Sequence, residues 1–371
     1  MDKKLREILT ASIFIAFLGG FLILHSLITP PEVSLSERRQ LATMPKLNAQ
    51  TLKSAEFMDN FEDYAADSFT FRDTFRTIRA FSVLDIFRLS DKSGLYYDEK
   101  VGAGKIEKLD ENSARKSAEK ILKMARSLEG LNVYYSVVPD KSVYAGRDLP
   151  GFDPVKTREI LAEFLSDYQY IDLTDSLSAE SFYKTDLHWD QTKIGGVSAK
   201  ILREMYPQSD LISAINPNIY DIINAGEFQG VYTGQLALPL APDELTYYRG
   251  TDWIVKYANE KTLELEEGEM YDTAAFAGRD PYDIFLRGSQ PFITIENPNN
   301  FDGRELYLFR DSFSSSLAPL LAVYYSKITL IDLRYIDSRV LPLLTEFKPG
   351  ADALFLYSSQ VLNNSSILLV S

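Results

Sequence analysis

The C-terminal third of the chain alternates short apolar runs with segments of helical periodicity. The apolar runs occupy residues 306–309, 328–331 and 353–357, and the helical segments between them cover 315–325 and 338–346. Short apolar runs separated by helices are typical of parallel strands that are buried on both faces. The pattern predicts three parallel strands with two crossover helices, and hence a three-layer α/β sheet.

The middle of the chain predicts the other half of the same sheet. An amphipathic helix is expected over residues 108–128, strands over 133–138 and 170–173, and a helix over 154–168 between these strands. Strand, helix and strand in this order form a βαβ unit. A further helix is predicted over 190–205, where Gly195 and Gly196 favour close packing against the sheet over a phosphate-binding loop.

Between these halves, residues 216–270 change to short alternating runs that are separated by Gly and Pro. This pattern predicts a β-rich insertion, although it does not decide whether the insertion is a separate domain. Two interpretations of its side chains remain open. They line a groove in which rings stack on sugar faces, or they pack as half-buried strand residues. The side chains concerned are Tyr232, Thr233, Tyr247, Tyr248 and Trp253.

The N-terminus carries an apolar stretch over residues 9–28, preceded by Lys3, Lys4 and Arg6. A stretch of about 20 apolar residues suits a membrane-spanning helix. The basic residues before it predict that everything after residue 30 lies outside the cytoplasm. A cleaved signal peptide is the alternative, but the run is long and residues 26–31 offer no small-x-small cleavage site. We expect an anchor over 1–30, a linker over 31–55 and one domain over 56–371.

Residues 55–87 carry aromatic and aliphatic side chains at mostly helical spacing, with a possible break at 68–72. Two helices that pack on a core explain this spacing. An amphipathic face that docks on a membrane partner explains it as well, and periodicity does not separate the two.

The composition of the chain excludes several kinds of partner and site. The net charge of −14 argues against a nucleic-acid partner, because binding to phosphates requires clustered Lys and Arg. The chain has no cysteine, which excludes disulfides and thiolate metal sites, and its two histidines leave little for a zinc centre. No metal and no cofactor is expected.

Ser312 is the candidate nucleophile. It lies in the stretch 310–314, between a predicted strand and a predicted helix. Such a turn presents a hydroxyl above the sheet edge, and the N–H groups that open the helix stabilise an oxyanion. The alternative is that Asp311 or Ser312 only caps the helix, since both residue types favour that position.

If a histidine of a folded domain acts as the base, it is His188, because the other histidine, His25, lies inside the apolar N-terminal segment. Asp186 stands two residues before His188. A carboxylate at that spacing can hold the imidazole tautomer while the other ring nitrogen takes the proton from Ser312. The alternative is that His188, which stands beside Trp189, is only a packing residue.

The stretch Asp186-Leu187-His188-Trp189 resembles the signature of the DHHW family, relatives of the bacterial alginate O-acetylation proteins with SGNH-hydrolase-like domains. The resemblance continues in the same order over roughly residues 35–360. The blocks that carry it are 35–41, 61–79, 138–144, 280–286, 311–313 and 331–335.

The resemblance implies an SGNH-hydrolase-like fold and an oxyanion or substrate-holding loop at Arg287, Gly288 and Ser289, where the family usually reads Gly-Gly-Asn. Gly288 is kept, but a serine hydroxyl has a shorter reach than an amide, so Arg287 and backbone N–H groups are expected to contribute. Lys141, in the turn after the strand 133–138, either meets an acyl or sugar oxygen or pairs with a nearby carboxylate.

The anchor and the triad pattern predict an extracytoplasmic acyl-ester enzyme. The resemblance implies that it is an O-acetyltransferase, which passes an acetyl group through Ser312 to a hydroxyl of a cell-surface or secreted polysaccharide. The resemblance also implies a polytopic membrane acyltransferase as the partner that supplies acetyl. Two alternatives remain: a carbohydrate acetylesterase with the same triad, and a noncatalytic scaffold that binds the polysaccharide or the acyltransferase.

Overall fold

The computed structural model describes residues 3–34, 36–207, 221–250, 252–259, 261–300 and 303–371. Its chain forms two compact units. One unit comprises Met1–Leu89 with Gly234–Pro239, and the other comprises Ser90–Thr233 with Leu240–Ser371. Residues 56–89 of the domain that we expected from residue 56 therefore group with the N-terminal segment. The start of the predicted insertion, 216–220, lies outside the described residues.

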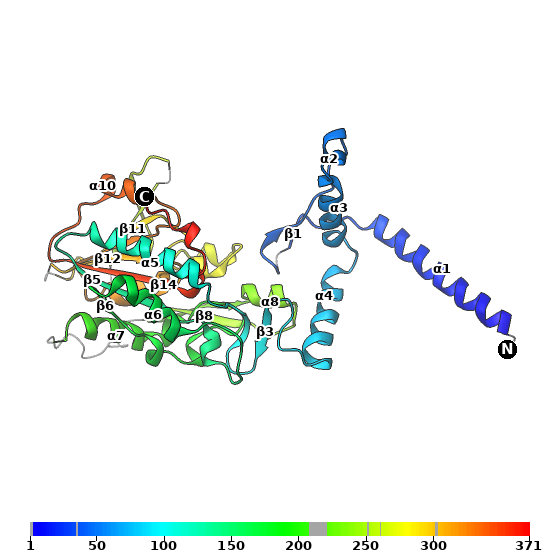
Figure 1. Ribbon diagram of the computed structural model, residues 1–371, viewed down its shortest axis with the longest axis horizontal. Coiled ribbons are helices and arrows are strands. Elements are labelled where there is room, and N and C mark those ends of the chain that lie inside the picture. The colour runs from blue at the N-terminus through cyan, green and yellow to red at the C-terminus, as the bar shows by residue number, and fades with distance from the viewer. Residues whose placement is uncertain (1–2, 35, 208–220, 251, 260, 301–302) are drawn as a thin grey trace. The chain divides into compact units, whose positions relative to one another are not determined.

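The first unit begins with the apolar helix α1, Lys3–Leu27, which has no buried residue (Figure 1). It is long and apolar enough to cross a membrane once. In the predicted linker, two short strands pair, and the helix α2 follows. The predicted helical region is indeed broken after Asp67. These elements are β1 Val33–Ser34, β2 Arg39–Gln40, α2 Ala49–Lys53, α3 Glu56–Asp67, α4 Arg72–Phe81 and a π-helical turn Ser82–Ile86.

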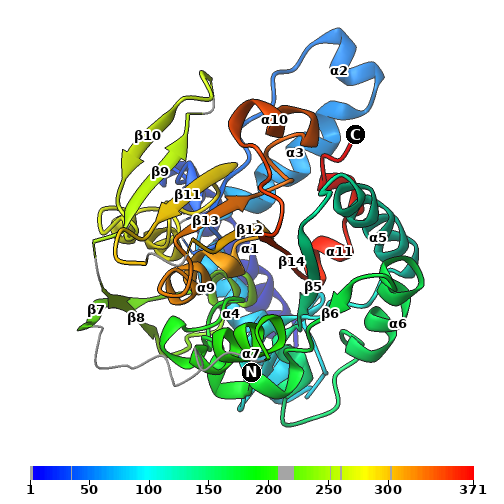
Figure 2. The same ribbon diagram turned by 90° about the vertical axis from the view of Figure 1, so that its left-hand side faces the viewer.

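The second unit is built on an eight-stranded sheet with the order β10-β9-β11-β13-β12-β14-β5-β6. Figure 2 shows these strands as successive neighbours from β10 at the left to β6 at the right. The five strands from β13 to β6 pair in parallel. Strand β11 pairs antiparallel with β13 and with β9, and β10 pairs antiparallel with β9. The bounds are β5 Asn132–Val138, β6 Gln169–Tyr170, β9 Ile254–Ala258, β10 Leu265–Gly268, β11 Phe292–Glu296, β12 Glu305–Arg310, β13 Lys327–Ile331 and β14 Asp352–Ser358.

Helices cover both faces of this sheet, as predicted. One apolar cluster joins Leu306 and Leu308 of β12 to the helices α7 and α9, and the other joins Tyr307 and Phe309 to α5 and α6. Alternate residues of a strand point to opposite faces, so a fully apolar strand supplies both clusters. The helices are α5 Glu111–Arg126, α6 Pro154–Leu165, α7 Gly195–Met205 and α9 Phe313–Leu321. The predicted three-layer α/β architecture with a mostly parallel sheet is confirmed.

Three details differ from the predicted elements. Helix α7 begins five residues late, because Asp190 caps a separate 3-10 turn, Gln191–Lys193. The predicted helix 338–346 shrinks to the 3-10 turn Ser338–Val340 and the four-residue α10, Leu341–Leu344. Strand β11 was not predicted.

The predicted insertion is rich in β-structure but is not a separate lobe. Its first two strands, β7 Asp221–Phe228 and β8 Asp243–Arg249, form a two-stranded sheet of their own and flank the short helix α8, Val231–Leu236. Its last two strands, β9 and β10, pair with β11 and so extend the central sheet. A small hairpin, β3 Leu95–Asp98 with β4 Gly102–Lys105, precedes α5.

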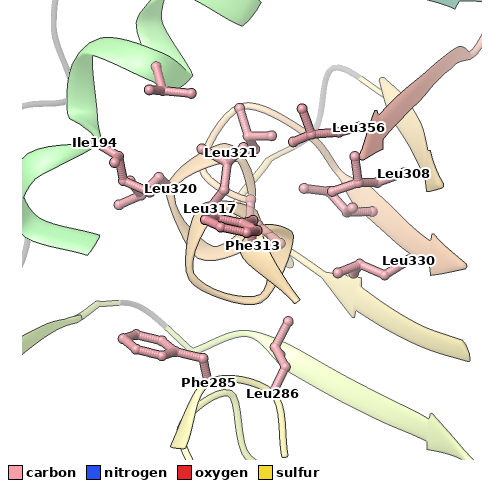
Figure 3. Packing of buried hydrophobic residues seen from close by; sticks show 14 of the residues in the cluster. Ile194, Phe285, Leu286, Leu308, Phe313, Leu317, Leu320, Leu321, Leu330 and Leu356 are labelled. Carbon is pink, nitrogen blue, oxygen red and sulfur yellow. The ribbon is translucent and has the colours of Figure 1, made fainter. Parts of the chain in front are cut away.

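Helix α9 occupies the middle of the core, and every one of its residues is buried. In Figure 3, its side chains Leu317, Leu320 and Leu321 point among apolar side chains of the sheet and of neighbouring loops. Because α9 follows directly from the central strand β12, this packing fixes the turn between them.

Candidate active site

The turn between β12 and α9 places Ser312 at the carboxyl end of a central parallel strand, where open α/β sheets bind their ligands. The Ser312 side chain makes no capping hydrogen bond. Asp311 serves that purpose instead: its carboxylate accepts the Phe313 N–H at 3.1 Å and the Ser358 N–H at 2.6 Å. Asp311 therefore ties the ends of β12 and β14 together, and the Ser312 hydroxyl is available for another partner.

That partner is His188. Its Nε2 lies 2.8 Å from the Ser312 Oγ, and its Nδ1 lies 2.7 Å from the Asp186 Oδ1. His188 and Asp186 are buried, while Ser312 is half-buried. The fold thus brings together the three side chains that the sequence singled out, across a separation of 124 residues.

The hydrogen bonds around Asp186 determine which ring nitrogen of His188 carries the proton. Its Oδ1 also accepts the His188 N–H at 3.2 Å, and its Oδ2 accepts the Val231 N–H at 3.0 Å. An ionised carboxylate only accepts hydrogen bonds, so the His188 Nδ1 must carry a proton and donate it. The Nε2 is then the acceptor that faces the Ser312 hydroxyl, which is the arrangement a general base requires.

A short hairpin holds His188 in place. Phe182 pairs with Trp189, and the Tyr183 N–H donates to the His188 carbonyl at 3.1 Å. The Trp189 indole N–H donates to the Phe313 carbonyl at 3.0 Å and to the Ser316 Oγ at 2.8 Å. Trp189 therefore links this hairpin to the helix α9.

Lys141 lies behind the hairpin. Its ammonium donates to the carbonyls of Tyr183 at 2.8 Å and Asp186 at 2.9 Å, and it lies over the Tyr232 ring. The side chain is buried, and burial lowers its pKa from 10.5 to about 8. This position suits a support for the loop, in place of the contact with an acyl or sugar oxygen that we considered.

Other neighbours close around the same loop. The Asp243 carboxylate accepts the N–H groups of Lys184 at 2.9 Å and Thr185 at 2.7 Å. The Gly230 N–H donates to the Thr185 hydroxyl at 2.8 Å. A β-carbon at Gly230 would lie 2.3 Å from the Thr185 carbonyl, so this approach requires glycine.

One aromatic residue beside His188 was not assigned a role from the sequence, although it lies in the block 280–286. The Tyr282 ring stacks on the imidazole with a centroid distance of 3.8 Å and an angle of 5° between the planes. Its hydroxyl lies 2.8 Å from the Ser316 Oγ, and the residue is buried. The short 3-10 turn Pro281–Ile284 positions this ring, and Asp280 caps that turn.

The expected oxyanion loop adjoins the nucleophile through Arg310. Leu286, Arg287 and Gly288 have consecutive left-handed φ values of 54°, 54° and 69°. The buried Arg310 guanidinium donates to the carbonyls of Gly288 and Gln290, both at 3.2 Å, and to the Ser315 hydroxyl at 2.7 Å. This residue therefore connects the loop with the turn that carries the candidate nucleophile.

The side chains of the loop have other partners. The Arg287 guanidinium lies over the Tyr257 ring at 4.7 Å, and its Nε lies 3.7 Å from the Asp272 carboxylate. The Ser289 hydroxyl accepts a hydrogen bond from Tyr335 at 3.3 Å. Among the hydrogen bonds of the described residues, none uses the Ser312 N–H.

An open cleft of about 400 Å³ lies on the insertion side of the unit. Tyr247, Trp253 and Tyr271 line it, together with Asp252 and Glu269. Two of the aromatic residues considered for a sugar groove therefore do line a cleft. Tyr232, which we also considered for the groove, is buried, and its hydroxyl accepts a hydrogen bond from the Gln360 side chain at 3.1 Å.

In the part of the chain that the structure describes, no group of three or more His, Asp or Glu side chains is arranged to hold a metal ion. The groups that converge at Ser312 are a hydroxyl, an imidazole and a carboxylate. A hydroxyl that can lose its proton to an adjacent imidazole is equipped to attack an acyl carbon.

Comparison with known proteins supports the fold. A DHHW family protein from Eubacterium siraeum superposes with a TM-score of 0.61 at 18% sequence identity, over 75% of this chain and 94% of that chain. PatB1 from Bacillus cereus superposes with a TM-score of 0.59 at 19% identity, over 74% of this chain and 99% of that one. A second structure of PatB1, which carries a sulfonyl adduct, gives 0.58 at 18% identity, over 75% and 97%.

No protein-family model matches the sequence, and no curated protein matches it either. The class that the architecture defines is a three-layer α/β fold with a mostly parallel central sheet. Within that class, the chain has the fold of a DHHW family protein and of PatB1, in agreement with the resemblance of the sequence.

Proposed function

We propose that this protein is a serine-dependent O-acetyltransferase that moves an acetyl group through Ser312 onto a hydroxyl of a cell-surface or secreted polysaccharide. The observation that carries the proposal is the hydrogen-bonded line from Asp186 through His188 to the Ser312 hydroxyl. A buried carboxylate, an imidazole and a half-exposed hydroxyl in this order are the parts of an acyl-transfer triad.

In the proposed first step, the Ser312 Oγ attacks the carbonyl carbon of an acetyl donor while the His188 Nε2 accepts the hydroxyl proton. The oxyanion faces the Ser312 N–H. As the tetrahedral intermediate collapses, the bond from the acetyl carbon to the donor oxygen or sulfur breaks, and His188 protonates that leaving group.

In the second step, a sugar hydroxyl takes the place of the donor. His188 removes its proton, the sugar oxygen attacks the acetyl-serine, and the Ser312 oxygen leaves with the proton that His188 returns. The cleft at Tyr247 and Trp253 supports a carbohydrate acceptor, because aromatic rings stack on sugar faces and its Asp252 and Glu269 accept hydrogen bonds from sugar hydroxyls.

The proposed location is the outer face of the cell membrane, with α1 as a single-pass anchor. The apolar length of α1 and the basic residues Lys3, Lys4 and Arg6 in its first turn support this orientation. A polytopic membrane acyltransferase is the proposed partner that supplies acetyl, an inference that rests on the resemblance of the sequence to the DHHW family.

The first test is acetate release from a small acetyl ester by the full-length protein in detergent. We expect Ser312→Ala and His188→Ala to abolish release while circular dichroism stays unchanged. Ser314→Ala is the matched control: its hydroxyl is buried without a hydrogen-bond partner in the described part of the chain, so its removal should leave activity intact.

A sulfonyl fluoride gives an independent measure of serine dependence, and PatB1 carries a sulfonyl adduct in one of its structures. Mass spectrometry should find the adduct on the peptide with Ser312 in the wild type, and it should find none in Ser312→Ala. Equal acetate release by the wild type and by both triad variants would contradict the serine mechanism.

Acetate release that does not fall when a polysaccharide acceptor is added, with no acetylated polymer formed, would instead favour the acetylesterase. A wild type that releases no acetate should next be tested for acetyl transfer with the membrane partner present. Failure there as well would leave the noncatalytic scaffold.

A further inference from the structure

The helix α4 turns its polar side toward its own unit. Arg72 donates to the Glu37 carboxylate at 2.5 Å, and Arg76 lies 3.1 Å from the same carboxylate. Arg76 also donates to the Gly234 carbonyl at 2.7 Å. These bonds fix the rotation of α4 about its axis, because two arginines one turn apart are held on one side.

The opposite side of α4 is apolar and exposed. Phe71, Phe75 and Ile78 are spaced i, i+4 and i+7, so they form one stripe, and Phe81 extends it. Their exposed fractions are 55%, 49%, 54% and 53% in that order. A helix of a soluble domain shows the reverse arrangement, and exposed aromatic stripes of this kind mark an interaction surface.

The stripe continues at both ends. Before α4, Phe69 is 43% exposed, and its ring contacts the Phe75 ring at a centroid distance of 5.6 Å. Exposed apolar side chains also follow α4 along the chain. They are Ile86, Phe87 and Leu89.

The same stripe meets the end of the apolar helix α1. The Phe69 ring lies 5.2 Å from the Phe21 ring, and the Thr70 hydroxyl lies 2.9 Å from the His25 Nδ1. Phe21 and His25 belong to the last two turns of α1, which ends at Leu27. The aromatic surface therefore starts at the level where the membrane-length helix ends.

We propose that the α4 stripe, defined as Phe69, Phe71, Phe75, Ile78 and Phe81, lies in the interface of the bilayer that α1 spans. The inference rests on the anchor role proposed for α1. Aromatic side chains concentrate at the boundary between acyl chains and headgroups, and amphipathic helices bind there with their apolar face. The occupant of this surface is thus lipid, since the contacts with Phe21 and His25 continue it directly into the membrane segment.

The absence of cysteine from the chain makes the test direct, because one introduced cysteine carries a label without background. Full-length Phe75→Cys and Ile78→Cys variants, labelled with an environment-sensitive fluorophore, are reconstituted into phosphatidylcholine and phosphatidylglycerol vesicles. Asp73→Cys is the matched control on the same helix, because its side chain is 71% exposed and lies on the polar side. Leu18→Cys reports on α1.

We expect lipids with a nitroxide in the acyl chain to quench the labels at residues 75 and 78 several-fold more strongly than the label at 73. Aqueous iodide should give the opposite order. Labels at 75 and 78 that iodide reaches as readily as the label at 73 would overturn the proposal. Labels shielded from both quenchers would overturn it too, in favour of a second copy of the chain.

The label at residue 18 separates this proposal from the one on which it rests. If lipid nitroxides quench it while the labels at 75 and 78 remain in water, the anchor stands and only the stripe fails. If residue 18 itself is not in lipid, the anchor fails. Neither readout depends on acetate release, so the enzymatic proposal is tested separately.

Discussion

The imidazole of His188 lies flat on the phenol ring of Tyr282, with 3.8 Å between the ring centroids and 5° between their planes. The two bonds of the imidazole, to Asp186 and to Ser312, fix its position within its own plane. The Tyr282 ring restricts the remaining rotation out of that plane. In the proposed mechanism, His188 exchanges a proton first with Ser312 and then with an acceptor hydroxyl, and both restraints would favour that role.

Two substitutions of Tyr282 should separate the effect of its ring from the effect of its hydroxyl. In Tyr282→Phe, Ser316 keeps the bond from the Trp189 indole, so we expect a loss of about 1 kcal/mol in the free energy of unfolding and nearly unchanged turnover. In Tyr282→Leu, the stacking is lost, and turnover should fall about tenfold, because such ring pairs contribute about 0.5–1.5 kcal/mol. Kinetics on an acetyl ester, together with thermal unfolding, checks both. Equal turnover by the two variants would contradict an orienting role for the ring.

Asp186→Asn should lower turnover by about 10⁴-fold without unfolding the protein. An amide offers one oxygen and one NH₂ group. If the NH₂ group faces the Val231 N–H, two donors oppose each other. If it faces the imidazole, His188 adopts the tautomer that cannot accept the Ser312 proton. Single-turnover acetylation of Ser312 would measure the effect.

Asp190→Asn is the control for that variant. The Asp190 carboxylate accepts the N–H and the hydroxyl of Thr192, both at 2.8 Å, so its replacement weakens a turn outside the triad. A small loss of stability with most activity retained is expected. An equal loss of turnover in both variants would mean that Asp186 acts through folding alone.

The triad was predictable because few residues compete for the roles. Only two histidines are present, one of them in an apolar helix, and the strand-turn-helix around Ser312 is a local pattern. The mostly apolar runs of β12, β13 and β14 likewise identified parallel strands without knowledge of their partners. Local chemistry was therefore enough to single out the three side chains that the fold brings together, and their catalytic roles stay a prediction.

The supports of the triad were not predictable, because their contacts join segments that are far apart in the sequence. Arg310 bonds to Gly288, Asp243 bonds to Thr185, and the Tyr282 ring stacks on His188, and no local spacing encodes these contacts. Strand β11 was missed for a related reason. Five residues suffice for it only because β9 and β13 pair with it on either side.

Gly230→Ala should lower activity although residue 230 is not part of the triad. A β-carbon there would lie 2.3 Å from the Thr185 carbonyl and 2.5 Å from the Asp186 β-carbon, so the hairpin must move. We expect a loss of about 1–3 kcal/mol in stability, typical of overpacking, and a larger fall in turnover than in substrate affinity. Steady-state kinetics and urea unfolding give both values.

Gly196→Ala provides the contrast. Its β-carbon would lie 3.6 Å from the Ser176 carbonyl, an ordinary contact, and alanine favours a helix by about 1 kcal/mol over glycine. This variant should be as active as the wild type and slightly more stable. A Gly230→Ala protein that behaved in the same way would show that the hairpin tolerates displacement.

Lys141→Met should weaken the contacts that hold the hairpin of His188 in place. The carbonyls of Tyr183 and Asp186 lose their shared donor, which costs about 1–3 kcal/mol for each group left unsatisfied. Turnover should fall as the hairpin gains freedom. Lys200→Met is the control, because it removes only an i, i+4 pair with Glu204, worth about 0.3–0.5 kcal/mol.

The pH dependence of stability tests the burial of Lys141 directly. The unfolded chain holds this proton up to the ordinary pKa of 10.5, whereas the folded chain releases it at a pKa of about 8. Between pH 8 and 10.5, the unfolded state therefore binds more protons, and the contribution of Lys141 to the free energy of unfolding rises with pH. Lys141→Met lacks this titration. The free energy of unfolding of the wild type minus that of the variant should increase across this range. A constant difference would mean that the two carbonyls keep the ammonium protonated in the folded protein.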